Sequence, residues 1–233
     1  GIFDACFPLK RVCSMRTAPG QQVVREPIDI RAELAGWGAS GIVGDYTNDG
    51  IRYLRRQVVT NARWTPLLET YDRYGRPRGA AAALMLNHGG FYAGSNWAYF
   101  GVENVDLFKD PSGPMAKAFQ EVARFLVRGT FLRQVVTEFR LYRPGETVKA
   151  NAVVDNRGGR AQPVSVRFTV SAVDSDAPTA TVTEQVLLAP GASQEVQVAL
   201  GPVASGPDLR RVACTLLADG AAIDELTTGF VVE

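Results

Sequence analysis

The segment Pro163–Ala172 alternates apolar and polar residues, and this alternation constrains the fold more than any other feature of the chain. Its apolar members are Val164, Val166, Phe168, Val170 and Ala172, and Ser165, Arg167, Thr169 and Ser171 lie between them. A period of two is typical of a β-strand that buries one face. The sequence therefore predicts a strand here, and similar signals recur at short intervals through residues 139–233.

Residues 139–233 are predicted to form a sandwich of short strands. The expected strands cover residues 139–143, 147–155, 163–173, 179–189, 193–200, 209–218 and 223–232. Turn-forming residues separate them: Pro144-Gly145, Asn156-Arg157-Gly158-Gly159, Pro190-Gly191 and Asp219-Gly220. Many short strands at this spacing, punctuated by such turns, predict an all-β immunoglobulin-like sandwich.

Residues 1–138 mix helix and strand signals and are predicted to form a mixed α/β (or α+β) domain, or the end of a larger one. The expected elements are a helix at 26–35, a glycine-rich loop at 36–41, paired strands at 64–70 and 80–87 around a turn-rich segment at 71–79, and a helix at 114–128. Pro114 suits the first helical position and Gly129 the position after the helix. We expect Phe119, Val122, Ala123 and Leu126 to form its apolar face against the preceding sheet.

Charge and aromatic content change near residues 137–143, where we place the domain boundary. Residues 1–138 carry 17 Lys and Arg against 13 Asp and Glu, whereas residues 139–233 carry 8 against 11. Basic residues are not concentrated in stripes with aromatics, which argues against nucleic-acid binding. No apolar run approaches the roughly 20 residues of a membrane span.

The cysteines and the histidine argue against a metal site. His88 is the only histidine and the sequence contains no Cys-x-x-Cys, so we expect no metal and no cofactor. Cys6 and Cys13 are close enough in sequence to pair if the segment folds back, and their pairing is left open. Cys214 shares a strand face with Val212 and Leu216 and is interpreted as a small buried hydrophobic residue.

Three turn motifs in the second part resemble a known type of accessory domain. They are Pro144-Gly145-Glu146, Asn156-Arg157-Gly158 and Leu188-Ala189-Pro190-Gly191. Over about 95 residues the pattern is similar to the immunoglobulin-like, cell-adhesion-related domains of bacterial secreted enzymes and adhesion proteins. The resemblance implies a spacer, packing partner or binding module at the cell surface or outside the cell, because such folds do not determine one function.

The first part has a fainter resemblance, carried by "WTPLLETYDRYGRPRGAAAALM", "GSNWAYFGVENVDLF" and the helix that follows. It resembles the degenerate glutamine-amidotransferase-like domain of large bacterial glycoside hydrolases. No nucleophilic cysteine elbow with a downstream His-x-Glu is present, so no catalytic residue is carried over. Because the sequence begins with Gly1 and shows no signal peptide, we expect a processed or engineered product, or a fragment of a longer protein.

The segment at 87–104 is the strongest candidate for ligand binding, since it combines aromatic and amide side chains with the single histidine. Sugars stack on aromatic faces, and their hydroxyl groups bond to Asn, Asp and Glu. The predicted glycan contacts are His88, Tyr92, Asn96, Trp97 and Glu103. The alternative is a glycine-rich connection whose aromatics fill a core or an interface and whose histidine is structural.

No complete catalytic constellation is found. A glycosidase needs two carboxylates on either side of the bond, and neither Glu103 with Asp106 nor Asp45 with Asp49 has a spacing that indicates such a pair. The serines lack the Gly-x-Ser-x-Gly spacing of a hydrolase elbow.

The leading hypothesis is a non-catalytic C-terminal portion of a secreted bacterial carbohydrate-active enzyme. Its expected partners are a polysaccharide and a catalytic domain of the same polypeptide or assembly. The alternatives are a stand-alone hydrolase that uses Glu103, Asp106 or His88, and a structural adhesion or assembly module.

Overall fold

The computed structural model describes residues 12–13, 22–24, 42–43, 62–71, 77–89, 93–100, 105–173, 175, 177–204 and 208–233. The chain divides into two compact units, Gly1–Leu126 and Val127–Glu233. The domain boundary after residue 138 stays a prediction. The helix expected at 26–35, the loop at 36–41, the Cys6–Cys13 pairing and the pair Asp45 and Asp49 lie outside the described residues.

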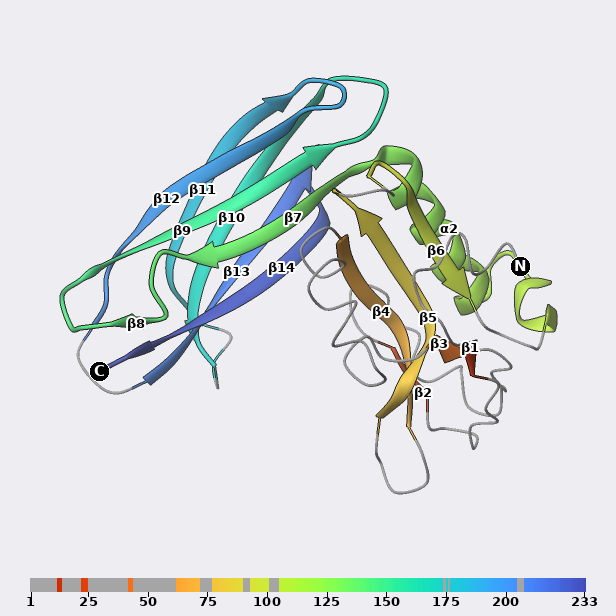
Figure 1. The fold of residues 1–233 in the computed structure, drawn as a ribbon, viewed down its shortest axis with the longest axis horizontal. Coiled ribbons are helices and arrows are strands. Elements are labelled where there is room, and N and C mark those ends of the chain that lie inside the picture. The colour runs from red at the N-terminus through yellow and green to blue at the C-terminus, as the bar shows by residue number, and fades with distance from the viewer. Residues whose placement is uncertain are drawn as a thin grey trace. The chain divides into compact units, whose positions relative to one another are not determined.

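The described strands of the first unit form one antiparallel sheet (Figure 1). They are β1 (Val12–Cys13), β2 (Gln22–Val24), β3 (Ile42–Val43), β4 (Ala62–Tyr71), β5 (Pro77–Asn87) and β6 (Asn96–Phe100). The order is β1-β3-β5-β4-β2, and β6 pairs with β5. The predicted pairing of residues 64–70 with 80–87 is confirmed, since Trp64 lies opposite Met85 and Glu69 opposite Ala80.

The predicted fold class, a mixed α/β or α+β domain followed by an immunoglobulin-like sandwich, is wrong for the part of the chain that the structure describes. An α/β domain needs parallel strands joined through helices, whereas every strand pairing described in the first unit is antiparallel. The described residues are mostly strand, and α2 (Pro114–Arg128) is the one α-helix among them. The glycine-rich and helix-like sequence signals in residues 1–61 led to the wrong class.

The helix α2 has the predicted bounds, but it buries a different face. Gly129 follows it with φ 67°, the left-handed conformation that glycine adopts without strain. The buried side chains are Met115, Ala116, Ala118 and Val122. Phe119, predicted to be buried, is 51% exposed. Its ring instead packs beside Phe100 of β6 and Phe108 of the short helix η3 (Val105–Phe108).

The second unit consists of two sheets around one hydrophobic core. One sheet has the order β11-β10-β13-β14-β8 and the other β12-β9-β7 (Figure 1). Their strands are β7 (Thr130–Thr137), β8 (Leu141–Tyr142), β9 (Thr147–Asn156), β10 (Gln162–Ala172), β11 (Pro178–Leu188), β12 (Ser193–Pro202), β13 (Asp208–Ala218) and β14 (Ala221–Val232). Each of the seven predicted strands is observed near its predicted place. The strand β7 was not predicted.

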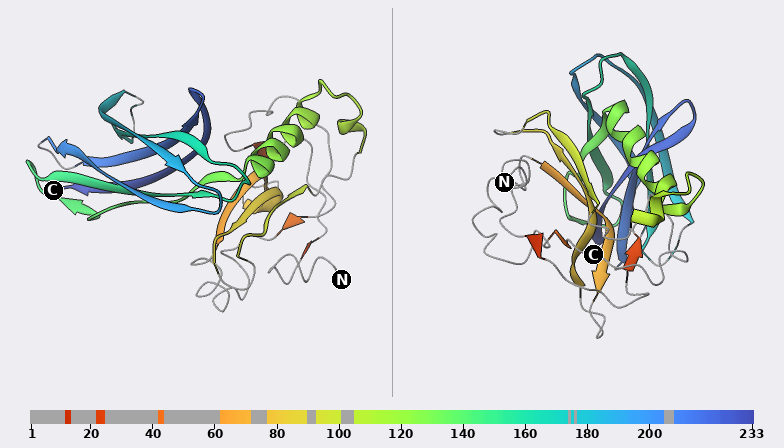
Figure 2. Two further views of the ribbon diagram at one scale, coloured as in Figure 1. Left: turned by 90° about the horizontal axis from the view of Figure 1, so that it is seen from above. Right: turned by 90° about the vertical axis from the view of Figure 1, so that its right-hand side faces the viewer.

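The two sheets of the second unit curl into a half-barrel, in place of the predicted immunoglobulin-like sandwich. Their long strands appear as curved ribbons in Figure 2. The strands β7 and β14, which belong to different sheets, are connected by a side chain. The backbone N–H of Leu132 donates a hydrogen bond of 2.8 Å to Oδ2 of buried Asp224. Because this carboxylate takes the place of a ladder partner, it satisfies a backbone donor that the curl would otherwise leave buried and unpaired. Among the described helices, none is long and apolar enough to cross a membrane.

Cys214 lies in the core of the second unit, as predicted from its strand position. It is a free thiol with no solvent exposure. Burial, followed by the charges of Asp224 and Glu225, raises the pKa of its thiol from 9.0 to about 12. Both effects disfavour the thiolate, so the folded protein keeps Cys214 neutral where an unfolded chain ionises it.

The free energy of unfolding should therefore depend on the ionisation of Cys214 only at high pH. Below pH 9 both states hold the proton and the contribution to stability is constant. Between pH 9 and about 12 the unfolded state alone loses the proton, so the free energy of unfolding falls as pH rises. We expect Cys214→Val to remove this part of the pH dependence, measured by urea denaturation from pH 8 to pH 10. An unchanged slope in the variant would contradict the buried, neutral thiol.

Candidate functional site

The β5–β6 hairpin carries the predicted ligand residues that the structure describes. His88 follows β5 directly, and Asn96 and Trp97 begin β6. Buried Asn87 at the end of β5 bonds to the residues just before β6: its Nδ2 donates to Ser95 O at 2.6 Å, and its carbonyl accepts from Gly94 N at 2.8 Å. The other two predicted contacts, Tyr92 and Glu103, lie outside the described residues.

Asn96 and Trp97 do not share a face of the sheet. Asn96 lies opposite Leu86 and Trp97 opposite Met85, and successive strand residues point to opposite sides. Trp97 therefore shares its face with Tyr99, which is not among the predicted contacts. All of β6 is half-buried, and burial raises the pKa of the Tyr99 hydroxyl. The ligand-binding role of His88, Asn96 and Trp97 stays a prediction.

Asp106, the carboxylate of the rival hydrolase hypothesis, is a solvated side chain in η3. It forms an ion pair of 2.7 Å with Lys109, and its side chain is 65% exposed. Asp106 and Lys109 therefore form an ordinary exposed ion pair three residues apart. His88, the other described residue of that hypothesis, is half-buried at the end of β5.

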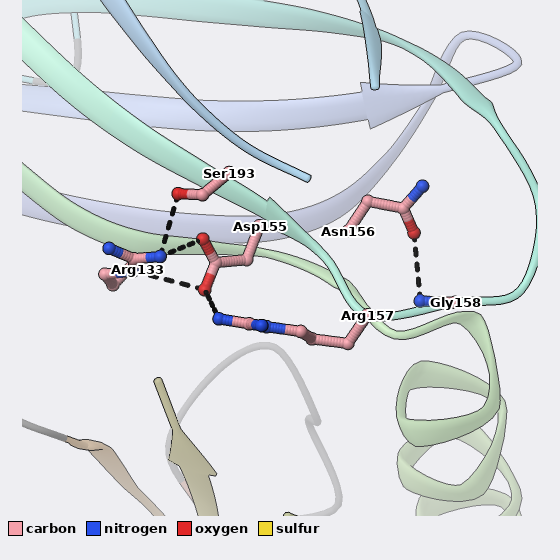
Figure 3. A network of polar contacts seen from close by, with 6 residues as sticks. All are labelled: Arg133, Asp155, Asn156, Arg157, Gly158 and Ser193. Atoms are coloured by element: carbon pink, nitrogen blue, oxygen red, sulfur yellow. Dashed lines mark hydrogen bonds and ion pairs between the residues drawn. The ribbon is translucent and has the colours of Figure 1, made fainter. Parts of the chain in front are cut away.

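The second unit contains a polar network that the sequence analysis missed (Figure 3). Asp155 has no solvent exposure and accepts hydrogen bonds from two arginines. Arg133 donates from Nε at 3.1 Å and from Nη2 at 2.5 Å, and Arg157 donates from Nη2 at 3.2 Å. Arg133 also bonds to Ser193 Oγ at 2.8 Å. We call Arg133, Asp155, Arg157 and Ser193 the Asp155 network.

An irregularity in the sheet places Arg133 over Asp155. The pairing of β7 with β9 shifts register between Leu132 and Gln134, so Arg133 is the extra residue of a β-bulge. A bulge redirects the side chain of its extra residue. Since Asp155 alternates with buried Val154, the strand pattern places it on the outer face, where a charged side chain is ordinarily solvated. The sequence pattern alone therefore does not indicate that it is fully buried.

Asn156 links two of the turn motifs that carry the accessory-domain resemblance. Its Nδ2 lies within hydrogen-bonding distance of Arg160 O, Leu188 O and Ala189 O, at 2.8, 3.1 and 3.1 Å. Its Oδ1 accepts from Gly158 N at 3.0 Å. The Asn-x-Gly turn and the Leu-x-Pro-Gly turn are therefore held together by one buried amide.

The chain segment at the start of the second unit passes very close to the Asn-x-Gly turn. Arg157 N donates to Gly129 O at 2.7 Å. A Cβ atom added to Gly158 would lie 2.6 Å from Arg128 O, and one added to Gly129 would lie 2.8 Å from Gly158 N. Both positions require glycine because backbone atoms, which cannot rotate away, occupy the space of a side chain.

The outer face of the larger sheet carries a row of exposed apolar side chains. Leu209 lies opposite Val231 across β13 and β14, and Val231 lies opposite Leu141 of β8. Val173, just after β10, donates its N–H to Leu209 O and extends the row. Their exposed fractions are 45% for Val173, 50% for Leu209, 43% for Val231 and 50% for Leu141. We call these four residues the apolar row.

No family model matches the chain, and no curated protein matches it. Solved structures that it resembles include several glycoside hydrolase chains. A Paenibacillus sp. cycloisomaltooligosaccharide glucanotransferase is 21% identical over 45% of this chain and 14% of that chain, with a TM-score of 0.39. A calcium-binding mutant of Bacteroides uniformis beta-glucuronidase 2 is 15% identical over 45% and 14%, with a TM-score of 0.40. Spo0M, a sporulation control protein from Bacillus subtilis, is 18% identical over 45% and 49%, with a TM-score of 0.33. The matches span about half or less of those chains, and at these scores they carry no argument about function.

Proposed function

We propose that this chain is a non-catalytic accessory portion of a larger carbohydrate-active enzyme, in which the second unit packs against another domain of the same polypeptide or assembly. The observation that carries the proposal is the apolar row. Three exposed apolar side chains are in register across β13, β14 and β8, and Val173 is hydrogen-bonded beside them through its backbone. Clusters of exposed apolar side chains mark interaction sites.

The size of the apolar row favours a tethered partner over a freely diffusing one. Stable interfaces bury about 800 Å² on each side, and four half-exposed side chains supply less than that. A partner domain on the same chain has an effective concentration of about millimolar, which makes a small surface sufficient.

The accessory role is also supported by the hydrogen bonds that residues of the three turn motifs form. Asn156 fixes the ends of β9 and β11, and Gly145 N and Glu146 O bond to the backbone of Val203. Glu146 also accepts a hydrogen bond from Arg143 N at 2.8 Å. The motif residues therefore stabilise the turns of the second unit. A stable, rigid domain is what a supporting role requires.

The apolar row should make the free chain weakly self-associating. We expect replacement of Leu209 and Val231 together by threonine to lower this association, because threonine keeps the β propensity and removes apolar surface. Sedimentation equilibrium at rising protein concentration measures the effect. Leu187→Thr, which removes an exposed leucine of β11 outside the row, is the matched control. Equal association in all three proteins would remove the row as a docking surface, and a tight, stable oligomer would favour an assembly module.

The glycan contact in the first unit is the second part of the proposal. We propose that the face of β6 with Trp97 and Tyr99 stacks on sugar rings, and that His88, Tyr92 and Glu103 are the contacts beside it. Asn96 lies on the opposite face of β6, so this arrangement leaves it out of the contact. We expect Trp97→Ala to weaken polysaccharide binding at least about tenfold, or about 1.4 kcal/mol. Isothermal titration calorimetry with a panel of soluble polysaccharides measures it.

Phe139→Ala is the control for this experiment, since Phe139 is 56% exposed and lies in the second unit. Absence of binding to every polysaccharide, or equal binding by Trp97→Ala, would remove the glycan contact. Turnover of an aryl glycoside or an ester by the full chain, abolished by His88→Ala or Glu103→Gln, would replace the accessory proposal by a hydrolase.

A further inference from the structure

The two sheets of the second unit line a cavity of about 310 Å³ that is partly open to solvent. Its buried wall is formed by Val148, Val170, Leu200 and Phe230, which come from four strands. Small-molecule sites in proteins are mostly apolar and range from about 300 to 1,000 Å³. The cavity is therefore within the size range of a site for a small ligand.

Both walls of the cavity contain a strand irregularity. The pairing of β10 with β11 shifts register between Val170 and Ser171, and that of β12 with β9 shifts between Ala199 and Pro202. In the second, Leu200 and Gly201 lie between the paired residues, and Gly201 has φ 90°. Bulges bend strands locally and occur beside binding sites. Both irregularities involve residues that line the cavity: Val170 in one wall, and Leu200 and Gly201 in the other.

One charged residue, Arg210, lines this space, and Thr179 is the one other polar side chain in its lining. It lies opposite Phe230 across β13 and β14, so it shares the inner face of the sheet with that buried ring. Its side chain is only 18% exposed, and Nη2 forms an ion pair of 3.1 Å with Asp208. A guanidinium has five N–H donors in a fork that matches a carboxylate, and the ion pair with Asp208 engages one nitrogen of that fork.

We propose that this cavity binds a small amphiphile with an apolar body and a carboxylate head, such as a medium-chain fatty acid. The head pairs with the guanidinium of Arg210, and the hydrocarbon body packs on Val148, Val170, Leu200 and Phe230. The apolar wall selects the body through burial of apolar surface, and the single guanidinium selects an anionic head over a neutral one. This site is independent of the accessory role, which rests on the outer face of the sheet.

The test is calorimetric titration of the full chain with octanoate, octanol and acetate. We expect octanoate to bind at least about tenfold more tightly than octanol, and acetate not to bind, because it lacks the apolar body. Arg210→Gln should reduce octanoate binding about tenfold and leave octanol binding unchanged. Arg167→Gln, the same substitution on the outer face of β10, should change neither. Ala204→Trp, which fills the cavity from an exposed lining position, should abolish both.

Three results would overturn the proposal. They are no binding of octanoate or octanol to the folded chain, equal affinity for octanoate and octanol, and octanoate binding that is unchanged in Arg210→Gln or Ala204→Trp. Far-UV circular dichroism and protection of the Cys214 thiol from alkylation check the folding of each variant. For these alkylation measurements the other two cysteines are replaced (Cys6→Ser and Cys13→Ser).

Discussion

Asp155→Ala is expected to lower the free energy of unfolding of the second unit by about 3–5 kcal/mol, the range for removing one partner of a buried ion pair. The carboxylate of Asp155 has no solvent exposure, and Arg133 and Arg157 both donate to it. Without it, two guanidinium groups that are each about three-quarters buried keep their charge and lose their shared partner. The cost is therefore that of uncompensated buried charge and exceeds the loss of the hydrogen bonds alone.

The buried thiol of Cys214 gives a measurement that reports on the second unit by itself. In a chain with Cys6→Ser and Cys13→Ser, alkylation of Cys214 at increasing urea concentration follows the opening of the core in which it lies. Asp155→Ala should shift the midpoint of this curve to lower urea. Ser193→Ala, which removes one bond to Arg133 and no charge, is the control and should cost only about 1 kcal/mol.

A double-mutant cycle separates the network from a general effect of the mutation. If Asp155 acts through Arg133, then Arg133→Ala combined with Asp155→Ala should cost less than the sum of the two single variants, with a coupling energy of about 1–3 kcal/mol. Strict additivity would show that the arginine is satisfied elsewhere, and would contradict the interpretation of Asp155 as the centre of the network.

Gly158→Ala is expected to destabilise the second unit by about 2–3 kcal/mol, the upper part of the range for overpacking. The added Cβ would lie 2.6 Å from Arg128 O and 3.1 Å from Asn156 Oδ1. Since the first neighbour is a backbone oxygen, relief requires the Asn-x-Gly turn to move away from the preceding segment. That movement would also lengthen the hydrogen bond from Arg157 N to Gly129 O.

The adjacent glycine supplies a matched control. A Cβ atom on Gly159 would meet nothing within 4 Å, so Gly159→Ala should change stability by no more than about 0.5 kcal/mol. Both variants are compared by the urea dependence of Cys214 alkylation. Both changes stiffen the unfolded chain equally, and this favours the folded state, so it cannot produce a difference between them. Similar costs for the two substitutions would therefore contradict the close backbone approach at Gly158.

The sequence predicted the strands of the second unit well because their pattern is local. In β10, the alternation of Val164, Val166, Phe168 and Val170 is observed as four buried side chains on one face. The strand β7 was missed because the bulge at Arg133 interrupts this period. Phe131 and Leu132 are both buried although they are adjacent, so no alternation marks the segment as a strand.

The helix shows a similar limit. Its bounds depend on Pro114 and Gly129, which act locally, and they were predicted correctly. Its buried face depends on what packs against it, and the apolar residues of α2 fit two overlapping stripes. The stripe with Met115, Ala118 and Val122 is buried, whereas Phe119 contacts rings of the chain segments before the helix and stays half-exposed.

Among the candidate sites, the sequence selected residues by type and could not determine which of them come together. Asn96 and Trp97 are neighbours in sequence, but their strand separates them onto two faces. Asp155 and Arg133 are far apart in sequence and meet only because a bulge and a strand pairing place one over the other. The cavity beside Arg210 likewise depends on two register shifts in different sheets.

By itself, then, the sequence determined the strand periodicity and turns of residues 139–233, the bounds of the helix and the burial of Cys214. These features depend on side-chain period and on glycine and proline positions, which act over a few residues. The tertiary structure alone decided the strand order of the first unit's sheet beyond the predicted pair, the curl of the second unit, the Asp155 network and the cavity. Each of these depends on the register between distant strands, and a shift of one residue changes which face a side chain occupies.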